Sequence, residues 1–259
     1  MSTDDRSLLE ARHSIEKSYH DQKALSAHGK VDRNFYAAGG LNLIWESYLA
    51  DLGDLRGKTV LDFGCGEGWS SVEYAKLGAV VYSFDISPES VRNLTHESRG
   101  SGISKRIHPA VMAAECLGYR ANTFDMVLGV SILHHTDPFA AGSEVSRVLK
   151  PGGRALFIEP LVHNVFLKIF RWLTPSRRTP TEQPMPVKQI QEFGRFFRRV
   201  EFRGYYLLSI FPQGLLWATG NRNLFHRTLR IAEAVDRVIL RTCKCLRRYC
   251  WSAIIEVEK

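Results

Sequence analysis

The fold of this 259-residue chain is decided by the stretch Val60-Leu61-Asp62-Phe63-Gly64-Cys65-Gly66-Glu67-Gly68. It joins a continuous apolar run to a turn rich in glycine, and a helical run from Trp69 to Leu77 follows. A second apolar run, Val80–Phe84, then ends at the carboxylate of Asp85. Apolar runs separated by a helix are typical of parallel strands that are buried on both faces. We therefore predict half of a doubly wound α/β sheet, with a ligand at the carboxyl ends of its strands.

The spacing of the glycines indicates which ligand binds. A dinucleotide-binding turn has the pattern G-x-G-x-x-G, because a pyrophosphate lies on the N-terminus of the helix. Here the glycines are Gly64, Gly66 and Gly68, and Trp69 stands where the third dinucleotide glycine would be. The bulk of Trp69 disfavours a pyrophosphate, whereas alternate glycines let a ligand without phosphates lie on the backbone. Asp85 follows Gly64 by 21 residues and can accept both hydroxyls of a ribose. An adenosine with a short zwitterionic tail would fit.

With these residues the chain resembles the class I S-adenosylmethionine-dependent methyltransferases, in the small-molecule group that includes quinone and natural-product enzymes. The resemblance rests on residues 60–68, Asp85, 128–135 and 144–160, and it spans about 55–160. It implies a Rossmann-like, seven-stranded and mostly parallel sheet, S-adenosylmethionine as cofactor and S-adenosylhomocysteine as product. The residues that we expect to contact the cofactor are Tyr19, Asp62, Gly64, Cys65, Gly66, Gly68, Asp85, Ile86, Ala113, Ala114 and Ser131.

The chain departs from the family pattern at the adenine-binding loop. The family usually places there an aspartate that accepts a hydrogen bond from the adenine amino group, and this chain has Ala113. Adenine recognition would then rely on backbone groups near Ala114 and on apolar packing from Ile86. The departure concerns the adenine contacts and leaves the predicted fold unchanged.

The candidate catalytic residues follow two neighbouring strands. His134 and His135 come after the strand at 125–130, and Glu159 ends the strand at 155–158. Methyl transfer from a sulfonium requires an acceptor held in line, and a hydroxyl acceptor must also lose its proton to a base with a pKa near 7. Imidazole has such a pKa. We therefore predict methylation of a hydroxyl oxygen with His135 as the base, His134 as the alternative base, and Glu159 orienting the imidazole or binding the acceptor.

Several alternatives stay open at this point. The two histidines could have only a packing role, and a carbon or nitrogen acceptor would use the same cofactor loop. A lipid or polyprenyl-like acceptor at a membrane surface is a second enzymatic hypothesis. A non-catalytic, cofactor-binding interaction subunit is the alternative outside enzymes, although the intact glycine turn and Asp85 disfavour it. We predict no metal site.

The rest of the chain is predicted to surround this core. We expect an N-terminal helical cap at 1–54, the cofactor-binding core at 55–160, a lid and helical insertion around the sixth strand at 161–249, and the last strand at 250–259, antiparallel at the sheet edge. In the resembled family a helix before the first strand lies across the cofactor pocket, so Tyr19 could touch the ligand. The proline-rich stretch at 174–186 is predicted to be a lid over the acceptor.

Charge is distributed unevenly along the chain. Residues 1–150 carry 16 Lys and Arg against 19 Asp and Glu, a net charge of −3, whereas residues 151–259 carry 19 against 8, a net charge of +11. Such a basic half attracts an anionic substrate, a membrane surface or nucleic acid, or is simply solvated. The motif of base-amino methylation is absent after the fourth strand, where Ser131-Ile132-Leu133-His134 stands, so we expect no nucleic-acid partner. We expect a hydrophobic or anionic small-molecule acceptor, and leave peripheral membrane contact and homo-oligomers open.

The cysteines and the N-terminus indicate the compartment. The five cysteines are scattered and lack the paired spacing of a zinc site, so we expect free thiols. No apolar stretch reaches transmembrane length, and residues 1–10 lack the pattern of a signal peptide. The expected location is the cytoplasm.

Overall fold

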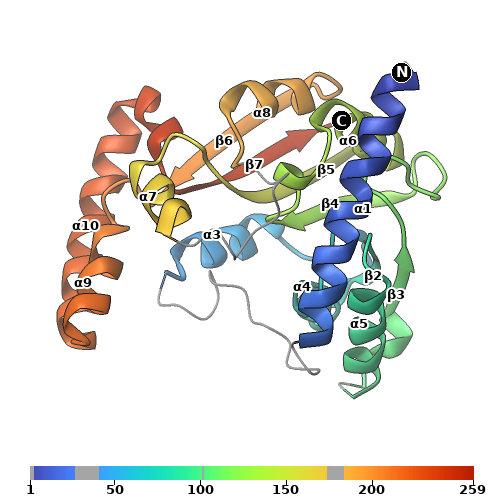
Figure 1. Ribbon diagram of the computed structural model, residues 1–259, viewed down its shortest axis with the longest axis horizontal. Helices are drawn as coiled ribbons and strands as arrows, with labels where there is room; N and C mark the ends of the chain where they lie inside the picture. The colour runs from blue at the N-terminus through green and yellow to red at the C-terminus, as the bar shows by residue number, and fades with distance from the viewer. Residues whose placement is uncertain (1–2, 27–40, 101, 174–183) are drawn as a thin grey trace.

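A sheet of seven strands in the order β3-β2-β1-β4-β5-β7-β6 forms the centre of the molecule (Figure 1). The computed structural model describes residues 3–26, 41–100, 102–173 and 184–259. Strands β1 to β5 pair in parallel, whereas β7 is antiparallel to both β5 and β6. The predicted seven-stranded, mostly parallel sheet is confirmed. The strands are Thr59–Phe63 (β1), Val80–Asp85 (β2), Ile107–Val111 (β3), Phe124–Val130 (β4), Leu149–Pro160 (β5), Arg199–Tyr205 (β6) and Ser252–Glu258 (β7).

The last strand is not at the sheet edge, where the sequence analysis placed it. β7 lies between β5 and β6, and β6 forms the edge. The burial of the two strands explains this order: Ala253, Ile254, Ile255 and Val257 of β7 are fully buried, so β7 requires neighbours on both sides. β6 instead begins with exposed residues at 199–201, which suit an edge strand.

The glycine-containing segment at 150–153 is part of β5 rather than a separate connection. The pairing of β4 with β5 shifts there, from Phe124 opposite Leu149 to Met126 opposite Arg154. Backbone hydrogen bonds join this irregular segment to the C-terminus, because the N–H of Lys259 donates to the carbonyl of Gly153 at 3.0 Å. The glycines therefore form a bulge that is held by the last residue of the chain.

The helices pack on the two faces of the sheet. Alternate residues of β5 separate the two cores: Leu156 and Ile158 face the cluster that includes residues of α3, α4 and α10, and Phe157 faces the cluster that includes residues of α6 and α8. The helices are Thr3–Ser26 (α1), Leu43–Leu52 (α3), Trp69–Lys76 (α4), Pro88–Gly100 (α5), Pro138–Val148 (α6), Val165–Leu173 (α7), Val187–Gly194 (α8), Phe211–Thr219 (α9) and Arg222–Thr242 (α10), with short 3-10 turns at Ser104–Arg106 (η1), Leu133–His135 (η2) and Lys244–Tyr249 (η4).

Two helices begin at side chains that cap them. The Ser87 hydroxyl accepts a hydrogen bond from the N–H of Ser90 at 3.1 Å, at the start of α5. The carboxylate of Asp137 accepts from the N–H of Ala140 at 2.8 Å, at the start of α6. Both side chains satisfy N–H groups that have no partner within the helix.

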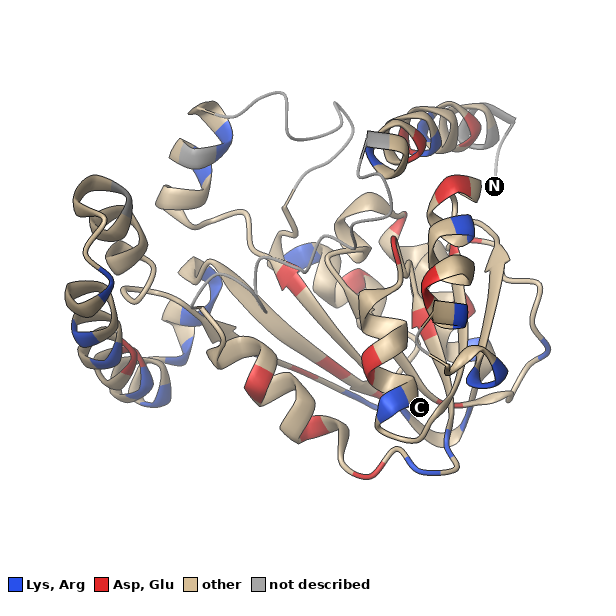
Figure 2. Cartoon of the chain, turned by 90° about the horizontal axis from the view of Figure 1, so that it is seen from below, with Lys and Arg blue, Asp and Glu red and all other residues tan. Residues whose placement is uncertain are grey.

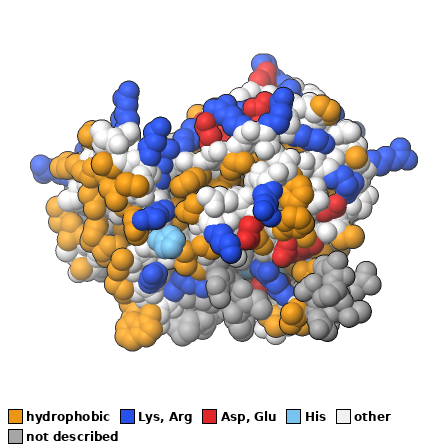
Figure 3. All heavy atoms as spheres, turned by 90° about the horizontal axis from the view of Figure 1, so that it is seen from above, with side chains coloured by type: hydrophobic (Ala, Val, Ile, Leu, Met, Phe, Trp, Pro, Cys, Tyr) orange, Lys and Arg blue, Asp and Glu red, His pale blue; other side chains and the backbone are white. Residues whose placement is uncertain are grey.

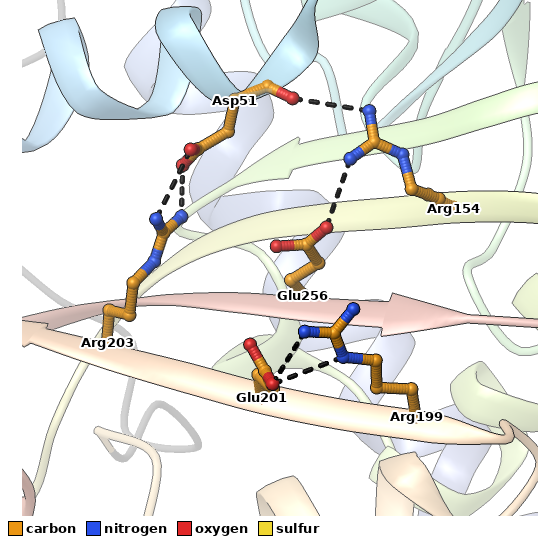
Figure 4. Close-up of polar contacts among 6 residues, drawn as sticks. All are labelled: Asp51, Arg154, Arg199, Glu201, Arg203 and Glu256. Carbon is orange, nitrogen blue, oxygen red and sulfur yellow. Dashed lines mark hydrogen bonds and ion pairs between the residues drawn. The ribbon is translucent and has the colours of Figure 1, made fainter.

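Ion pairs connect the antiparallel part of the sheet to α3 (Figure 4). Arg154 on β5 contacts Glu256 on β7 at 3.1 Å and donates to the backbone carbonyl of Asp51 at 3.3 Å. The carboxylate of Asp51 also accepts from Arg203 on β6. These groups are partly exposed, so we expect them to fix the position of α3 more than to add stability.

Basic residues recur along α10 (Figure 2). Four arginines of this helix, Arg227, Arg230, Arg237 and Arg241, are all exposed. Each of the five cysteines is a free thiol, as predicted, and Cys65 and Cys250 are buried. None of the described helices is long and apolar enough to cross a membrane. Most of the predicted lid, residues 174–183, lies outside the described ranges, and the predicted division into cap, core, insertion and last strand stays a prediction.

Candidate active site

A cavity of ≈ 360 Å³ lies at the carboxyl ends of the central strands. The glycine turn after β1, the end of β2, the segment after β4 and one face of α1 line it. Ligands bind at this position in open α/β sheets, where the order of the strands reverses. Helix α1 is held beside α5 (Figure 1), because the carboxylate of Asp21 accepts from the hydroxyl of Ser87 at 2.5 Å. The predicted helix across the pocket is therefore present.

The three glycines of the turn have different roles. Gly64, Gly66 and Gly68 all have positive φ angles, of +70°, +50° and +86°. A Cβ atom at Gly64 would collide with Ile132, and one at Gly68 would collide with Leu94 of α5. A Cβ at Gly66 would meet no atom within 4 Å, and Gly66 lines the cavity. Packing thus explains the glycines at 64 and 68, and open space above Gly66 is what a ligand on the turn requires.

Asp85 connects the turn to the second strand. Its Oδ2 accepts from the N–H of Gly66 at 2.9 Å, and its Oδ1 accepts from the N–H of Ser87 at 2.9 Å. The side chain is nearly buried at the cavity wall. A carboxylate can accept further hydrogen bonds on each oxygen, so Asp85 fits the predicted role as acceptor from two ribose hydroxyls.

Replacing Asp85 with alanine is expected to weaken S-adenosylmethionine binding by about 1–3 kcal/mol, through the loss of charge-assisted hydrogen bonds. Asp85→Asn is the matched control, because it keeps the size of the side chain and an acceptor for one of the two backbone N–H groups, but loses the charge and the second acceptor oxygen. Isothermal titration calorimetry on the three proteins checks this. An alanine variant that binds with unchanged affinity would place the ribose elsewhere.

Asp62 is buried beneath the turn and is not one of the described residues that line the cavity. Its Oδ2 accepts from the hydroxyls of Ser70 at 2.7 Å and Ser71 at 2.5 Å, so it holds the start of α4 against β1. Burial raises the pKa of Asp62 to about 6, although the two hydroxyls oppose the shift. The contact between Asp62 and the cofactor, which the sequence predicted, stays a prediction.

The pKa of Asp62 leads to a stability prediction. The carboxyl binds its proton more tightly in the folded chain than in the unfolded chain, so its contribution to stability is present below about pH 4 and is lost as pH rises to about 6. Asp62→Asn removes this loss of stability, because an amide does not ionise as pH rises. The free energy of unfolding of the variant should exceed that of the natural protein by about 1–3 kcal/mol at pH 7.5, and the difference should shrink toward pH 4.5. Urea unfolding at both pH values tests this, and a difference independent of pH would contradict it.

The segment after β4 is ordered by Glu159. Its Oε1 accepts from the N–H groups of Ile132 and Leu133 at 2.8 and 2.7 Å, and its Oε2 lies 2.6 Å from His134 Nδ1. Glu159 is 0% exposed, and neither it nor His134 is among the described residues that line the cavity. Ser131, which lines the cavity, has a left-handed φ of +56°, a conformation that costs a non-glycine residue about 1–3 kcal/mol. Glu159 therefore supports a strained segment at the site.

His135 is the predicted catalytic residue that reaches the cavity. Its ring lies 4.2 Å from that of His134, so the two strands do bring the three predicted residues together. Its Nδ1 lies 3.0 Å from Oε2 of Glu16, which comes from α1. Glu16, His13 and Lys23 of this helix face were not predicted from the sequence.

The polar face of α1 contributes His13, Glu16, His20 and Lys23, spaced three, four and three residues apart. This spacing places the side chains along one side of a helix, and it was the signal that could have identified them. Burial lowers the pKa of His20, which the charge of Asp85 partly opposes. Tyr19 is not among the described lining residues, and its ring lies edge-on to that of His20 at 5.4 Å.

A carboxylate is present in the predicted adenine loop, two residues after Ala113. Glu115 lines the cavity together with Met112, Ala114 and Ile86. Its carboxylate lies 3.0 Å from His13 Nε2 and accepts from the N–H of Asp137 at 2.9 Å. Burial alone would raise the pKa of Glu115, but these two contacts hold it below its usual value. Ala113 itself is not one of the described lining residues.

The site fits S-adenosylmethionine: Gly66 opens onto the cavity, Asp85 offers carboxylate oxygens at its wall, and Cys65 and Ile86 add apolar surface. A family model for a methyltransferase domain matches residues 61–157. Over 167 residues the chain is 34% identical to a ubiquinone biosynthesis O-methyltransferase of Paraburkholderia xenovorans, an alignment that covers 64% of this chain and 69% of that relative. The chain therefore belongs to the class I S-adenosylmethionine-dependent methyltransferases. It is an enzyme that uses S-adenosylmethionine as its methyl donor.

A second relative and a solved structure are also similar to this chain. It is 37% identical over 123 residues to a ubiquinone biosynthesis O-methyltransferase of Xanthomonas oryzae, covering 47% of this chain and 50% of that relative. The chain thus matches about half the length of this second relative. Among solved structures, the geranyl diphosphate C-methyltransferase of Streptomyces coelicolor, in complex with Mg²⁺, geranyl diphosphate and S-adenosylhomocysteine, superposes with a TM-score of 0.62. It is 15% identical, over 95% of this chain and 97% of that chain, so this likeness concerns the fold alone.

Proposed function

We propose that this enzyme transfers a methyl group to a hydroxyl oxygen of a small organic acceptor and that His135 takes the proton of that hydroxyl. The observation that carries the proposal is the position of His135, which lines the same cavity as Gly66 and Asp85. The names of the two relatives, both O-methyltransferases of ubiquinone biosynthesis, support an oxygen acceptor.

The contact with Glu16 suits His135 to the role of base. A carboxylate oxygen 3.0 Å from Nδ1 stabilises the positive charge that the ring gains when it takes a proton, and we assign the role of base to the other nitrogen, Nε2. The bound cofactor supplies an electrophilic methyl group on a sulfonium. The protein holds the acceptor oxygen in line with that methyl group. His135 receives the hydroxyl proton as the methyl carbon exchanges its bond to sulfur for one to oxygen, which leaves the neutral thioether S-adenosylhomocysteine.

An acceptor with a long apolar tail, presented at a membrane surface, is a second candidate. Four apolar residues of α7 are exposed, among them Trp172 at 80%. Figure 3 shows hydrophobic side chains gathered among Lys and Arg at the end of the molecule that carries α9 and α10. An apolar surface with basic side chains suits an anionic lipid surface. The exposed apolar residues of α7 are Val165, Ile169, Trp172 and Leu173.

Transfer of a labelled methyl group tests the proposal. The purified chain is incubated with methyl-labelled S-adenosylmethionine and an extract of its host, and the organic, aqueous, nucleic-acid and protein fractions are separated. We expect label in a small molecule as an O-methyl group, and its partition into the organic phase would favour the apolar acceptor. Label on carbon or nitrogen, or in RNA or protein, would overturn the proposal. Cofactor binding without any transfer would favour an interaction subunit.

A further inference from the structure

Three side chains with metal-binding atoms converge where α1 crosses the cavity. Glu16 and His20 come from α1, and His135 comes from η2, more than a hundred residues later. Within the described part of the chain, their ligand atoms all lie within 4.8 Å of one another. Glu16 Oε2 lies 3.0 Å from His135 Nδ1 and 3.7 Å from His20 Nε2.

These distances suit a small divalent ion. Zinc binds imidazole nitrogen and carboxylate oxygen at about 2.0–2.2 Å, so neighbouring ligands of a tetrahedral ion are about 3.3 Å apart. The two distances from Glu16 lie on either side of that value. Two imidazoles and one carboxylate are also a donor set of catalytic zinc sites, which leave the fourth position open. All three residues line the cavity, so an open position would face its interior.

The buried carboxylate is a second reason to expect an ion. The Glu16 side chain is 5% exposed, and a carboxylate removed from water is costly unless positive charge compensates it. Glu115, the other carboxylate near this face of α1, is paired with His13 instead. A cation held by Glu16 would add to the partners of this carboxylate and would connect α1 to the segment after β4.

We propose that Glu16, His20 and His135 bind one divalent transition-metal ion of the zinc type, and that this ion inhibits methyl transfer. The site itself does not depend on the proposed function, but its effect does. An ion on His135 Nδ1 requires the remaining ring proton to be on Nε2, the nitrogen proposed as the base. The acceptor hydroxyl then has no imidazole nitrogen to receive its proton.

The test begins with ion binding, which needs no methyl acceptor. The full chain is freed of metal with a chelator and titrated with Co²⁺, whose visible absorption reports its coordination, and Zn²⁺ affinity is measured by calorimetry. We expect one ion per chain. For His20→Ala we expect a loss of more than about 100-fold in Zn²⁺ affinity, because mutation of residues that only hydrogen-bond to a metal ligand already lowers affinity by about 10–100-fold. His13→Ala is the matched control, because His13 lines the cavity from the same helix but contacts Glu115. Absence of Co²⁺ absorption, or equal losses in the two variants, would overturn the site.

A second measurement separates the ion site from the proposed function. Methyl transfer is compared between the chelator-treated and Zn²⁺-loaded chain. Transfer that falls upon loading supports the inhibitory ion. Transfer that requires the ion would keep the site but overturn both its inhibitory effect and His135 as the base. Absence of transfer in both states, with Zn²⁺ binding intact, would overturn the proposed function and with it the inhibitory effect, and would leave the ion site standing.

Discussion

Replacing His135 with alanine is expected to lower turnover by about 10²–10⁴-fold, the usual contribution of a general base. The affinity for S-adenosylmethionine should change little, because the glycine turn and Asp85 belong to other segments. Turnover is measured by label transfer in the presence of a chelator, and cofactor affinity by calorimetry. The loss of activity should therefore appear in the turnover rate that is measured at saturating S-adenosylmethionine.

Two further variants separate the base from its surroundings. Glu16→Gln keeps the size of the side chain but removes the charge beside Nδ1, so we expect a smaller loss of turnover than for His135→Ala. His134→Ala removes a ring that is paired with the buried Glu159, so its main expected effect is on the unfolding free energy. Full activity of His135→Ala would mean that His134 is the base or that positioning alone suffices.

The central part of the fold was predictable because its signals are local. The apolar runs and the glycine turn each lie within a few neighbouring residues, and the structure confirms the strands and the helix that they predicted. The carboxylate of Asp85 was likewise found from its distance along the chain to the turn. Such patterns depend on backbone geometry and burial, and both can be inferred from the residues of a single segment.

Contacts between distant segments could not be predicted in this way. The pairing of Glu16 with His135 joins residues 119 positions apart, and only the docking of α1 brings them together. The sequence also placed Glu159 and His134 at the correct rim, but could not show that their side chains contact each other away from the cavity lining. The position of β7 inside the sheet depends on where the connection after β5 places β6, and in this fold it leaves room for one strand between β5 and β6. These features are decided by tertiary packing.

Gly66→Ala is expected to weaken S-adenosylmethionine binding by about 1–3 kcal/mol, or about 5- to 150-fold, the usual cost of extra volume in a well-packed site. The added Cβ enters space in which no protein atom lies within 4 Å, so the ligand alone would meet it. The positive φ of +50° adds backbone strain of about 1–2 kcal/mol, which lowers the stability of the fold and must be separated from the effect on the ligand.

Gly57→Ala provides that separation. Gly57 has a φ of +72°, also has no atom within 4 Å of a built Cβ, and is not one of the described residues that line the cavity. Both variants should lose similar free energy of unfolding in urea, because both force an alanine into the left-handed region. Only Gly66→Ala should lose cofactor affinity in calorimetry. Equal affinities in the two variants would mean that the cofactor does not lie on the turn, and the open space above Gly66 would then need another explanation.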